Sequence, residues 1–370
     1  MSKNVVVLVP NWNGGIDRLF ENINQAEHSE FKISMFNTHG RSLLGLSFLP
    51  FKLVYYTSAV LYTLILPFRL LAFALLCAFG RVDVCHVNLS TGASTIRKAL
   101  FALVCRLFRV PYVVHLHGGD YRRFFAGLPR PLQSMARSLY LNAERVIVLG
   151  AVWKQYVEQE IGVLQSKTQI LPNAVAGPAN FESSDKLSPP RIVFLGRLIK
   201  AKGIEELIDA LSSPQVASLS WTAVLAGDGE VAKYRDRIDA KGLSDRIELP
   251  GWVTGDAVDA ALRTSSIFAL PSHHENLPLS MLEAMAYGLC CIVTPVGSVE
   301  DVIQDSENGL VISVGDSAGL TRALLSVLQD KDLRDRLGLN AREDFLKQYD
   351  YKDYRGKLEA IYRSVLHVGN

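Results

Sequence analysis

The sequence predicts two α/β domains, each a parallel sheet covered by helices on both faces. Short, continuously apolar runs alternate with helical patterns along the whole chain. Strands of this kind are typical of parallel sheets that are buried on both sides. The runs form two series, separated by a segment rich in Pro, Ser, Gly and Asn that is typical of a linker. The pattern therefore indicates two doubly wound domains.

Length, charge and cysteine content agree with two intracellular domains. The 370 residues are enough for two buried cores. The net charge of +2 hides an asymmetry, since residues 1–175 carry 18 Lys/Arg against 9 Asp/Glu and residues 176–370 carry 21 against 28. A basic and apolar first half favours an anionic membrane surface or a lipid-linked polyanion over nucleic acid. The five cysteines lack metal-ligand spacing and favour a reducing cytosol.

Six strands are predicted in the first half. The first, in MSKNVVVLVP, is too short an apolar run for a signal peptide. The six runs are Val5–Val9, Lys32–Phe36, Val82–Val87, Tyr112–Leu116, Val146–Leu149 and Thr168–Leu171.

The segment Leu53–Gly80 carries a single charge, Arg69. Its length is compatible with a membrane-spanning helix, with a helix that lies on the domain and dips into the bilayer interface, or with an ordinary buried helix. A single crossing would place Val5–Val9 and Val82–Val87 on opposite sides of the membrane, where they could not share a sheet. We therefore predict the interfacial helix.

The second half repeats the alternation. Its predicted strands are Arg191–Leu195, Trp221–Ala226, Arg246–Leu249, Ile267–Leu270, Cys291–Thr294 and Leu310–Ile312. Ligands of doubly wound sheets bind beyond the carboxyl ends of the strands, so two facing domains would form a cleft.

A basic loop, Gly196–Gly203, joins the first strand of this half to a helical pattern. Arg197 and Lys202 would lie at this strand-to-helix junction, where free backbone N–H groups and the helix dipole favour an anion. Two cations at such a point suit a diphosphate leaving group.

Two carboxylates flank a predicted helix start in the segment PSHHENLPLSMLEAMAYG (271–288). Pro278 suits the first turn of a helix, which places Glu275 in the preceding loop and Glu283 in the second turn. Both could point into the space ahead of the helix and accept hydrogen bonds from vicinal hydroxyls of a sugar. The alternative is a solvated loop Glu with a Glu that pairs with the helix dipole. His273 and His274 are interpreted as loop residues.

The order of these motifs resembles the family 4 retaining glycosyltransferases, which have the GT-B fold. The resemblance covers most of residues 145–366. It rests on GRLIKAKG, AGDG, ELPGWV, the E-x7-E spacing, LPNAV, GLVISVGD and the closing FLKQYDYKDYRGKLEAIYRSVL. It implies Rossmann-like domains facing across a cleft: an acceptor domain over 1–175, a linker over 176–190, a donor domain over 191–348, and a helix over 349–370 that returns to the first domain.

The resemblance also implies roles for individual residues. Arg197 and Lys202 would bind the donor diphosphate, Glu275 the transferred sugar and Glu283 the ribose. Backbone contacts to the base or the sugar are implied for Trp252, Val253, Asn276, Leu277 and Leu279.

In the first half, Gly14 and Gly15 follow the first strand, where the family places a glycine loop near the diphosphate and acceptor. The alternative is an ordinary tight turn. HLHGGD (115–120) matches a family histidine that faces the reacting sugar, which would make His117 a catalytic residue. The alternative is a histidine satisfied within its turn.

The resemblance implies a retaining glycosyltransferase. Because Arg197, Lys202 and the helix N-terminus would supply the positive field, we expect it to be metal-independent and without a cofactor. The donor would be a UDP- or GDP-linked sugar, and the acceptor a lipid-linked saccharide or glycolipid. The enzyme would be cytoplasmic and peripheral on the inner face of the cell membrane. The alternatives are a GT-B sugar-nucleotide epimerase and a non-catalytic GT-B subunit of a membrane assembly.

Overall fold

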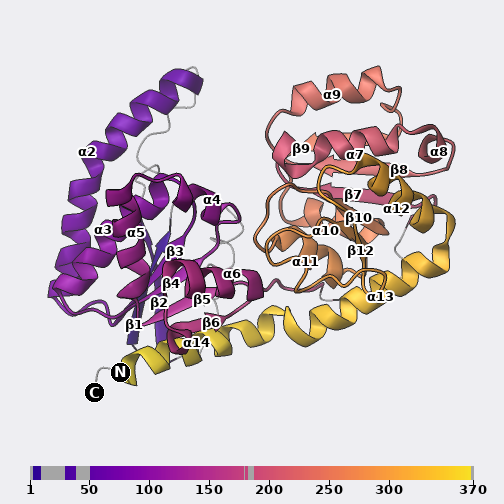
Figure 1. Cartoon of the computed structure of the whole chain (residues 1–370). Helices are drawn as coiled ribbons and strands as arrows, with labels where there is room; N and C mark the ends of the chain where they lie inside the picture. Colours follow the sequence, from indigo (N-terminus) through magenta and orange to yellow (C-terminus); the bar gives the residue numbers. More distant parts are fainter. Residues whose placement is uncertain (1–2, 10–29, 39–50, 179, 182–186, 368–370) are drawn as a thin grey trace. The chain divides into compact units, whose positions relative to one another are not determined.

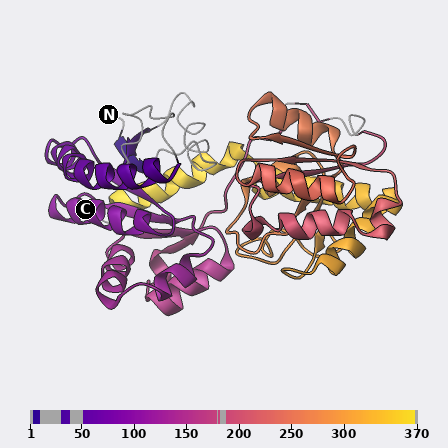
Figure 2. The same ribbon diagram turned by 90° about the horizontal axis from the view of Figure 1, so that it is seen from above.

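The computed structural model describes residues 3–9, 30–38, 51–178, 180–181 and 187–367, with the backbone alone for 51–63 and 367. The chain divides into two compact units. The first comprises residues 1–171 and 355–370, and the second comprises residues 172–354. Each unit is built around its own sheet, with helices beside it (Figures 1 and 2).

The first unit contains a six-stranded sheet in the order β2-β1-β3-β4-β5-β6, with every neighbouring pair parallel. Strand β1 lies inside the sheet, with β2 on one side and β3 to β6 in sequence order on the other. The strand order therefore reverses between β1 and β3. The strands are β1 (Lys3–Val9), β2 (Phe31–Asn37), β3 (Val84–Leu89), β4 (Tyr112–Leu116), β5 (Arg145–Val148) and β6 (Thr168–Ile170).

Helices bury both faces of this sheet. One face packs into a core that includes Phe73 of α2, Phe101 of α3 and Tyr140 of α5. The other face meets α14, where the rings of Phe31 and Tyr362 lie 5.6 Å apart, centroid to centroid. The helices are α2 (Phe51–Ala78), α3 (Ala93–Leu107), α4 (Tyr121–Ala126), α5 (Arg130–Leu141), α6 (Ala151–Tyr156) and α14 (Tyr351–His367), with a π-helical turn at Val157–Ile161 and a 3-10 turn at Gln165–Lys167.

The nearly uncharged segment Leu53–Gly80 forms most of α2. Its second half anchors the helix, because Phe73 and Cys77 are buried in the core. The opposite side exposes large apolar side chains, namely Leu64, Phe68, Leu71, Leu75 and the adjoining Phe79. No helix in the part of the chain that the structure describes combines the length and hydropathy needed to cross a membrane.

The second unit contains a parallel sheet in the order β12-β11-β10-β7-β8-β9. Its order reverses between β7 and β10, which makes the loops after these two strands the expected place for a ligand. The strands are β7 (Arg191–Leu195), β8 (Thr222–Ala226), β9 (Ile247–Gly251), β10 (Ile267–Leu270), β11 (Cys290–Val293) and β12 (Leu310–Val311).

The helices of the second unit follow the predicted periodicity. In α7, Ile204, Leu207, Ile208 and Leu211 are all buried, as their spacing requires. The helices are α7 (Ile204–Leu211), α8 (Pro214–Ala217), α9 (Val231–Ala240), α10 (Asp256–Thr264), α11 (Leu279–Ala286), α12 (Ser317–Gln329) and α13 (Lys331–Gln348), with a 3-10 turn at Lys200–Lys202.

The predicted fold class is confirmed, and each of the twelve predicted runs overlaps a strand of the structure. The ends differ by at most two residues. All five cysteines are buried and none forms a disulfide.

Candidate functional site

The loops after β7 and β10 are in direct contact. The backbone of Gly203 has φ = 70°, and a Cβ at this position would lie 1.9 Å from the carbonyl oxygen of Pro271. Only glycine fits this approach. The amide of His273 donates to the carbonyl of Ala201 at 2.9 Å, which fastens the second loop to the first.

Lys202 and Glu275 form an ion pair across these loops, from Nζ to Oε1. The Lys202 side chain is 25% exposed and that of Glu275 only 10%. Ser272 also donates its hydroxyl to the same carboxylate oxygen, at 2.9 Å. The sequence therefore identified two residues that the fold brings together. Because both side chains are largely shielded from water, their electrostatic interaction is stronger than it would be in bulk solvent.

Arg197 is placed differently. It also follows β7, and its Nε lies 3.3 Å from Oδ1 of Asp228, but its side chain is 60% exposed. The AGDG turn lies against this segment, since a Cβ on Gly227 would lie 1.7 Å from the carbonyl oxygen of Gly196. Arg197 is thus a cation at the surface of the second unit, close in sequence to Lys202 but less shielded from solvent.

Hydrogen bonds from other parts of the second unit fix the backbone of the segment that carries Glu275. The Asn276 carbonyl accepts from the amide of Ser298 at 2.7 Å. The Leu277 carbonyl accepts from the side-chain amide of Asn173 at 2.8 Å. Asn173 belongs to the LPNAV motif and is buried, so this motif positions the loop, a role that sequence reasoning did not assign.

The helix that follows begins as predicted. Pro278 is the N-cap of α11 and Leu279 its first residue. Glu283 lies in the second turn and is half-buried. After β9, Trp252 is exposed and Val253 half-buried. Their proposed contacts with a nucleotide remain predictions.

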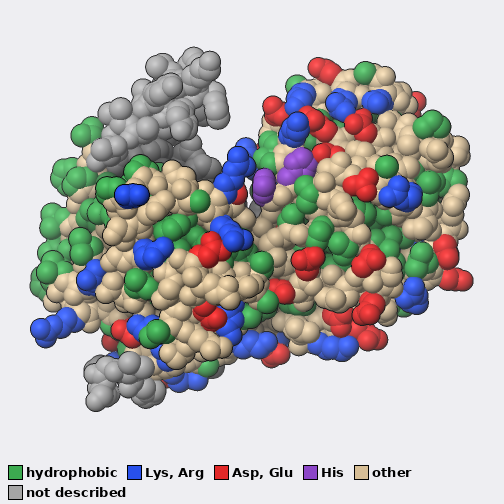
Figure 3. All heavy atoms as spheres, viewed as in Figure 1, with side chains coloured by type: hydrophobic (Ala, Val, Ile, Leu, Met, Phe, Trp, Pro, Cys, Tyr) green, Lys and Arg blue, Asp and Glu red, His purple; other side chains and the backbone are tan. Residues whose placement is uncertain are grey.

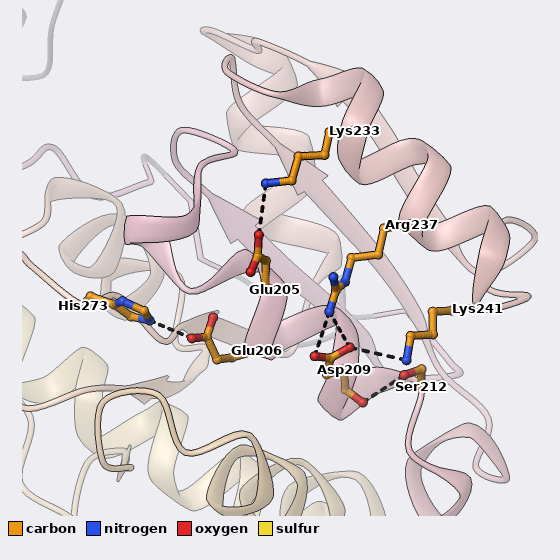
Figure 4. A network of polar contacts seen from close by, with 8 residues as sticks. All are labelled: Glu205, Glu206, Asp209, Ser212, Lys233, Arg237, Lys241 and His273. Atoms are coloured by element: carbon orange, nitrogen blue, oxygen red, sulfur yellow. Dashed lines mark hydrogen bonds and ion pairs between the residues drawn. The ribbon is translucent and has the colours of Figure 1, made fainter.

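His273, interpreted from sequence as a loop residue, has a specific partner. Its Nε2 lies 2.7 Å from Oε1 of Glu206 in the first turn of α7 (Figure 4). The neighbouring Glu205 and Asp209 of α7 face α9 instead and pair with Lys233, Arg237 and Lys241 (Figure 4). His273 therefore links the Glu275 loop to α7, and only the tertiary fold reveals this link.

In the first unit, His117 is buried directly after β4. Its Nε2 lies 3.1 Å from Oδ1 of Asn88, at the end of β3. Its ring lies against that of His115, with centroids 4.0 Å apart and the ring planes tilted by 40°. Burial lowers the pKa of His117 well below its ordinary value, and His86 and Lys98 add to this effect. His117 is thus a neutral imidazole at the carboxyl edge of the sheet.

The predicted Gly14–Gly15 loop lies outside the described residues. The neighbours of His117 were not identified from the sequence. A signal was present, because His86 and Asn88 alternate within an otherwise apolar strand, and polar residues in a fully buried strand are unusual.

The two doubly wound parallel sheets define the class of fold, the GT-B fold, which solved structures of similar topology share. Residues 37–174 match the family model "Glycosyl transferase 4-like domain", and residues 178–344 match "Glycosyl transferases group 1". The chain belongs to the group 1 glycosyltransferases, which confirms the predicted resemblance.

Relatives and solved structures agree with this assignment. The chain is 25% identical to the phosphatidyl-myo-inositol mannosyltransferase of Mycobacterium leprae, over 79% of this chain and 76% of the relative. Sucrose-phosphate synthase from Thermosynechococcus elongatus shares the fold with a TM-score of 0.80 at 17% identity, over 99% and 100% of the two chains. Anabaena HepE in complex with UDP-glucose aligns with a TM-score of 0.72 at 18% identity, over 98% and 99%.

Proposed function

We propose that this glycosyltransferase transfers a sugar from a nucleoside diphosphate sugar to a membrane-associated, lipid-linked acceptor. The product would belong to a surface polysaccharide or a glycolipid. The observation that carries the proposal is the shielded Lys202–Glu275 pair at the point where the strand order of the second sheet reverses. A cation beside a carboxylate suits a ligand with a phosphate next to sugar hydroxyls.

In this proposal, Lys202 and Arg197 stabilise the negative charge that develops on the departing diphosphate. Glu275 accepts hydrogen bonds from the transferred sugar and Glu283 from the ribose. His117 contacts the reacting sugar. The bond between the anomeric carbon and the phosphate oxygen breaks on the face where the acceptor oxygen bonds. The acceptor's proton passes to the departing phosphate oxygen, so that the anomeric configuration is retained.

The stereochemistry and the metal requirement are each directly testable. Proton NMR of the first product should show the same anomeric configuration as the donor, and an inverted product would exclude the proposed course. Turnover should survive EDTA, because Arg197 and Lys202 supply the positive field. Activity that EDTA abolishes and a divalent ion restores would contradict this.

The membrane part of the proposal is supported by the surface of the first unit. Hydrophobic side chains gather on the face where α2 lies (Figure 3). Leu103 and Leu107 of α3 are also exposed, and the exposed Arg106 and Arg109 adjoin them in sequence. Apolar side chains with interspersed arginines favour the inner face of a cell membrane, where anionic lipids gather.

Flotation with anionic vesicles tests this surface. The protein should float at low salt and less so at high salt. A Phe68→Glu, Leu71→Glu variant should float poorly, whereas Leu339→Glu, at an exposed leucine of α13 in the second unit, should behave as the wild type. Equal flotation of all three proteins would refute the assigned surface.

The activity itself is tested by incubating the purified protein with a panel of UDP- and GDP-sugars, with and without lipid-linked acceptors. Acceptor-dependent release of the nucleoside diphosphate supports the proposal. Conversion of the donor without any acceptor requirement would indicate an epimerase. No turnover with any donor, together with no donor binding, would favour a non-catalytic subunit.

A further inference from the structure

A cluster of polar side chains is buried within the sheet of the first unit. His86 and Asn88 alternate along β3, His115 lies on the neighbouring β4, and His117 follows β4. In the parallel register Asn88 lies beside His115. Each of the four side chains is at least nine-tenths buried. Buried polar groups normally have hydrogen-bond partners, so the partners of this cluster are informative.

The deep end of the cluster is satisfied. The hydroxyl of Tyr362 on α14 lies 2.8 Å from Nδ1 of His86. The Nε2 of His86 lies 3.2 Å from Nδ1 of His115. Burial lowers the pKa of His86 to about 3, and it lowers the pKa of His115 and of His117 well below the ordinary range. The three imidazoles are therefore neutral, each with one N–H donor and one lone pair.

The end near the carboxyl edge of the sheet is not satisfied. In the part of the chain that the structure describes, three buried atoms have no hydrogen-bond partner: Nδ2 of Asn88, Nε2 of His115 and Nδ1 of His117. Each such atom costs roughly 1–3 kcal/mol if it stays unpaired. Their mixture of donor and acceptor capacity fits a ligand with hydroxyl groups, which both donate and accept.

The hydrogen bond between Asn88 and His117 determines whether Nδ1 of His117 is a hydrogen-bond donor or an acceptor. Oδ1 of Asn88 can only accept, so the facing Nε2 of His117 must carry the proton. A neutral imidazole that is protonated on Nε2 has its lone pair on Nδ1, which is the atom without a partner. The amide of Asn88 thus selects one tautomer, as carboxylates and carbonyls do for other functional histidines.

We propose that Asn88 is a positioning residue that fixes His117 in the Nε2-protonated tautomer, so that the Nδ1 lone pair accepts a hydrogen bond from a saccharide hydroxyl. The identity of the ligand rests on the proposed function, whereas the tautomer is a property of the free protein. The hydroxyl belongs either to the sugar of the donor or to the acceptor, and the kinetic test distinguishes these two sources.

The tautomer is measured first, in the free full-length protein labelled with 15N-histidine. Long-range 1H–15N spectra at neutral pH should show His117 neutral with its proton on Nε2, the signals being assigned by their loss in His117→Gln. Asn88→Asp keeps an acceptor oxygen and should keep this tautomer. Asn88→Leu should give a mixture, and Asn142→Leu, at an exposed site of the same unit, should change nothing. A charged His117, or a proton on Nδ1, in the wild type would overturn the proposal without bearing on glycosyl transfer.

Kinetics then identifies the hydroxyl. Asn88→Leu should raise KM by about tenfold for the substrate that carries it, because the Nε2–H of His117 loses its acceptor and the Nδ1 lone pair is no longer fixed, while Asn88→Asp should recover most of the loss. A rise in the donor's KM assigns the hydroxyl to the transferred sugar, and a rise in the acceptor's KM assigns it to the acceptor. An Asn88→Leu protein with wild-type melting, a shifted tautomer and unchanged KM for both substrates would overturn the proposed contact. A wild type that turns over no donor would refute the proposed function instead, with the tautomer measurement still standing.

Discussion

Replacing Lys202 by Ala is the sharpest test of the donor site. At about 4 Å, a unit charge interacts with another by roughly 4 kcal/mol at an effective dielectric of ~20 but by only about 1 kcal/mol in bulk water. Lys202 is 25% exposed and Arg197 60%, so the two cations lie toward opposite ends of this range. We expect Lys202→Ala to lower kcat/KM by about 10²–10³. Arg197→Ala should lower it by about five- to tenfold.

The matched control is Lys200→Ala. Lys200 lies in the same 3-10 turn and is exposed, and its replacement removes the same charge. This variant should stay close to the wild type. The assay is release of nucleoside diphosphate from the donor that the sugar-nucleotide panel identifies, with kcat and KM measured separately.

Stability must be measured alongside, because Lys202→Ala removes the cation that pairs with Glu275 and leaves the hydrogen bond from the Ser272 hydroxyl in place. A largely buried carboxylate that loses one hydrogen-bond partner destabilises the fold by roughly 1–3 kcal/mol. The double variant Lys202→Ala, Glu275→Gln should recover stability but not turnover. A folded Lys202→Ala protein with turnover equal to that of Lys200→Ala would remove Lys202 from the mechanism, and equal losses for Lys202 and Arg197 would contradict the reasoning from exposure.

Three further outcomes are expected. His273→Ala should raise the donor KM by about fivefold, with kcat nearly unchanged, since a partly buried hydrogen bond that holds the Glu275 loop is worth about 1 kcal/mol; an unchanged KM would show that the link to α7 does not position the loop. Burial lowers the pKa of His86 from 6.5 to about 3, so the unfolded chain binds the proton more readily and stability falls as pH drops below 6.5. Between pH 7 and pH 5 this histidine should cost about 2 kcal/mol in urea unfolding, and His86→Phe should flatten the pH dependence; parallel slopes would contradict the burial effect. Gly203→Ala should destabilise by more than about 3 kcal/mol, because its Cβ would overlap the Pro271 carbonyl, whereas Gly242→Ala, with a similar φ of 68° and open space, should cost about 1 kcal/mol; equal melting temperatures for the two variants would refute the close approach.

The sequence was sufficient for the fold because its main signal is local. Continuous apolar runs mark strands that are buried on both faces, and each predicted run overlaps a strand. The ends of the strands were predicted less accurately than the strands themselves. For example, the run Val82–Val87 predicts a strand that the structure places at Val84–Leu89. The placement of Lys202 and Glu275 at one edge of the second sheet was also predictable, because both follow strands that flank the reversal of strand order.

Two long-range hydrogen bonds in the candidate sites could not be predicted from the sequence. The link between His273 and Glu206 joins residues 67 positions apart, and no periodicity encodes it. The contact between Asn88 and His117 depends on the register of β3 against β4, which the sequence does not give. Long-range hydrogen bonds of this kind follow from the assembled sheet, so local patterns indicate the candidates without showing their partners.

The division of the chain also has a consequence for the order in which the protein folds during synthesis. The first unit is completed by residues 355–370, which leave the ribosome after the whole of the second unit. Until then Phe31 and His86 lack their contacts with Tyr362, and one face of the nascent sheet is uncovered. A chain truncated after residue 354 should therefore contain a protease-resistant second unit beside a protease-sensitive first one.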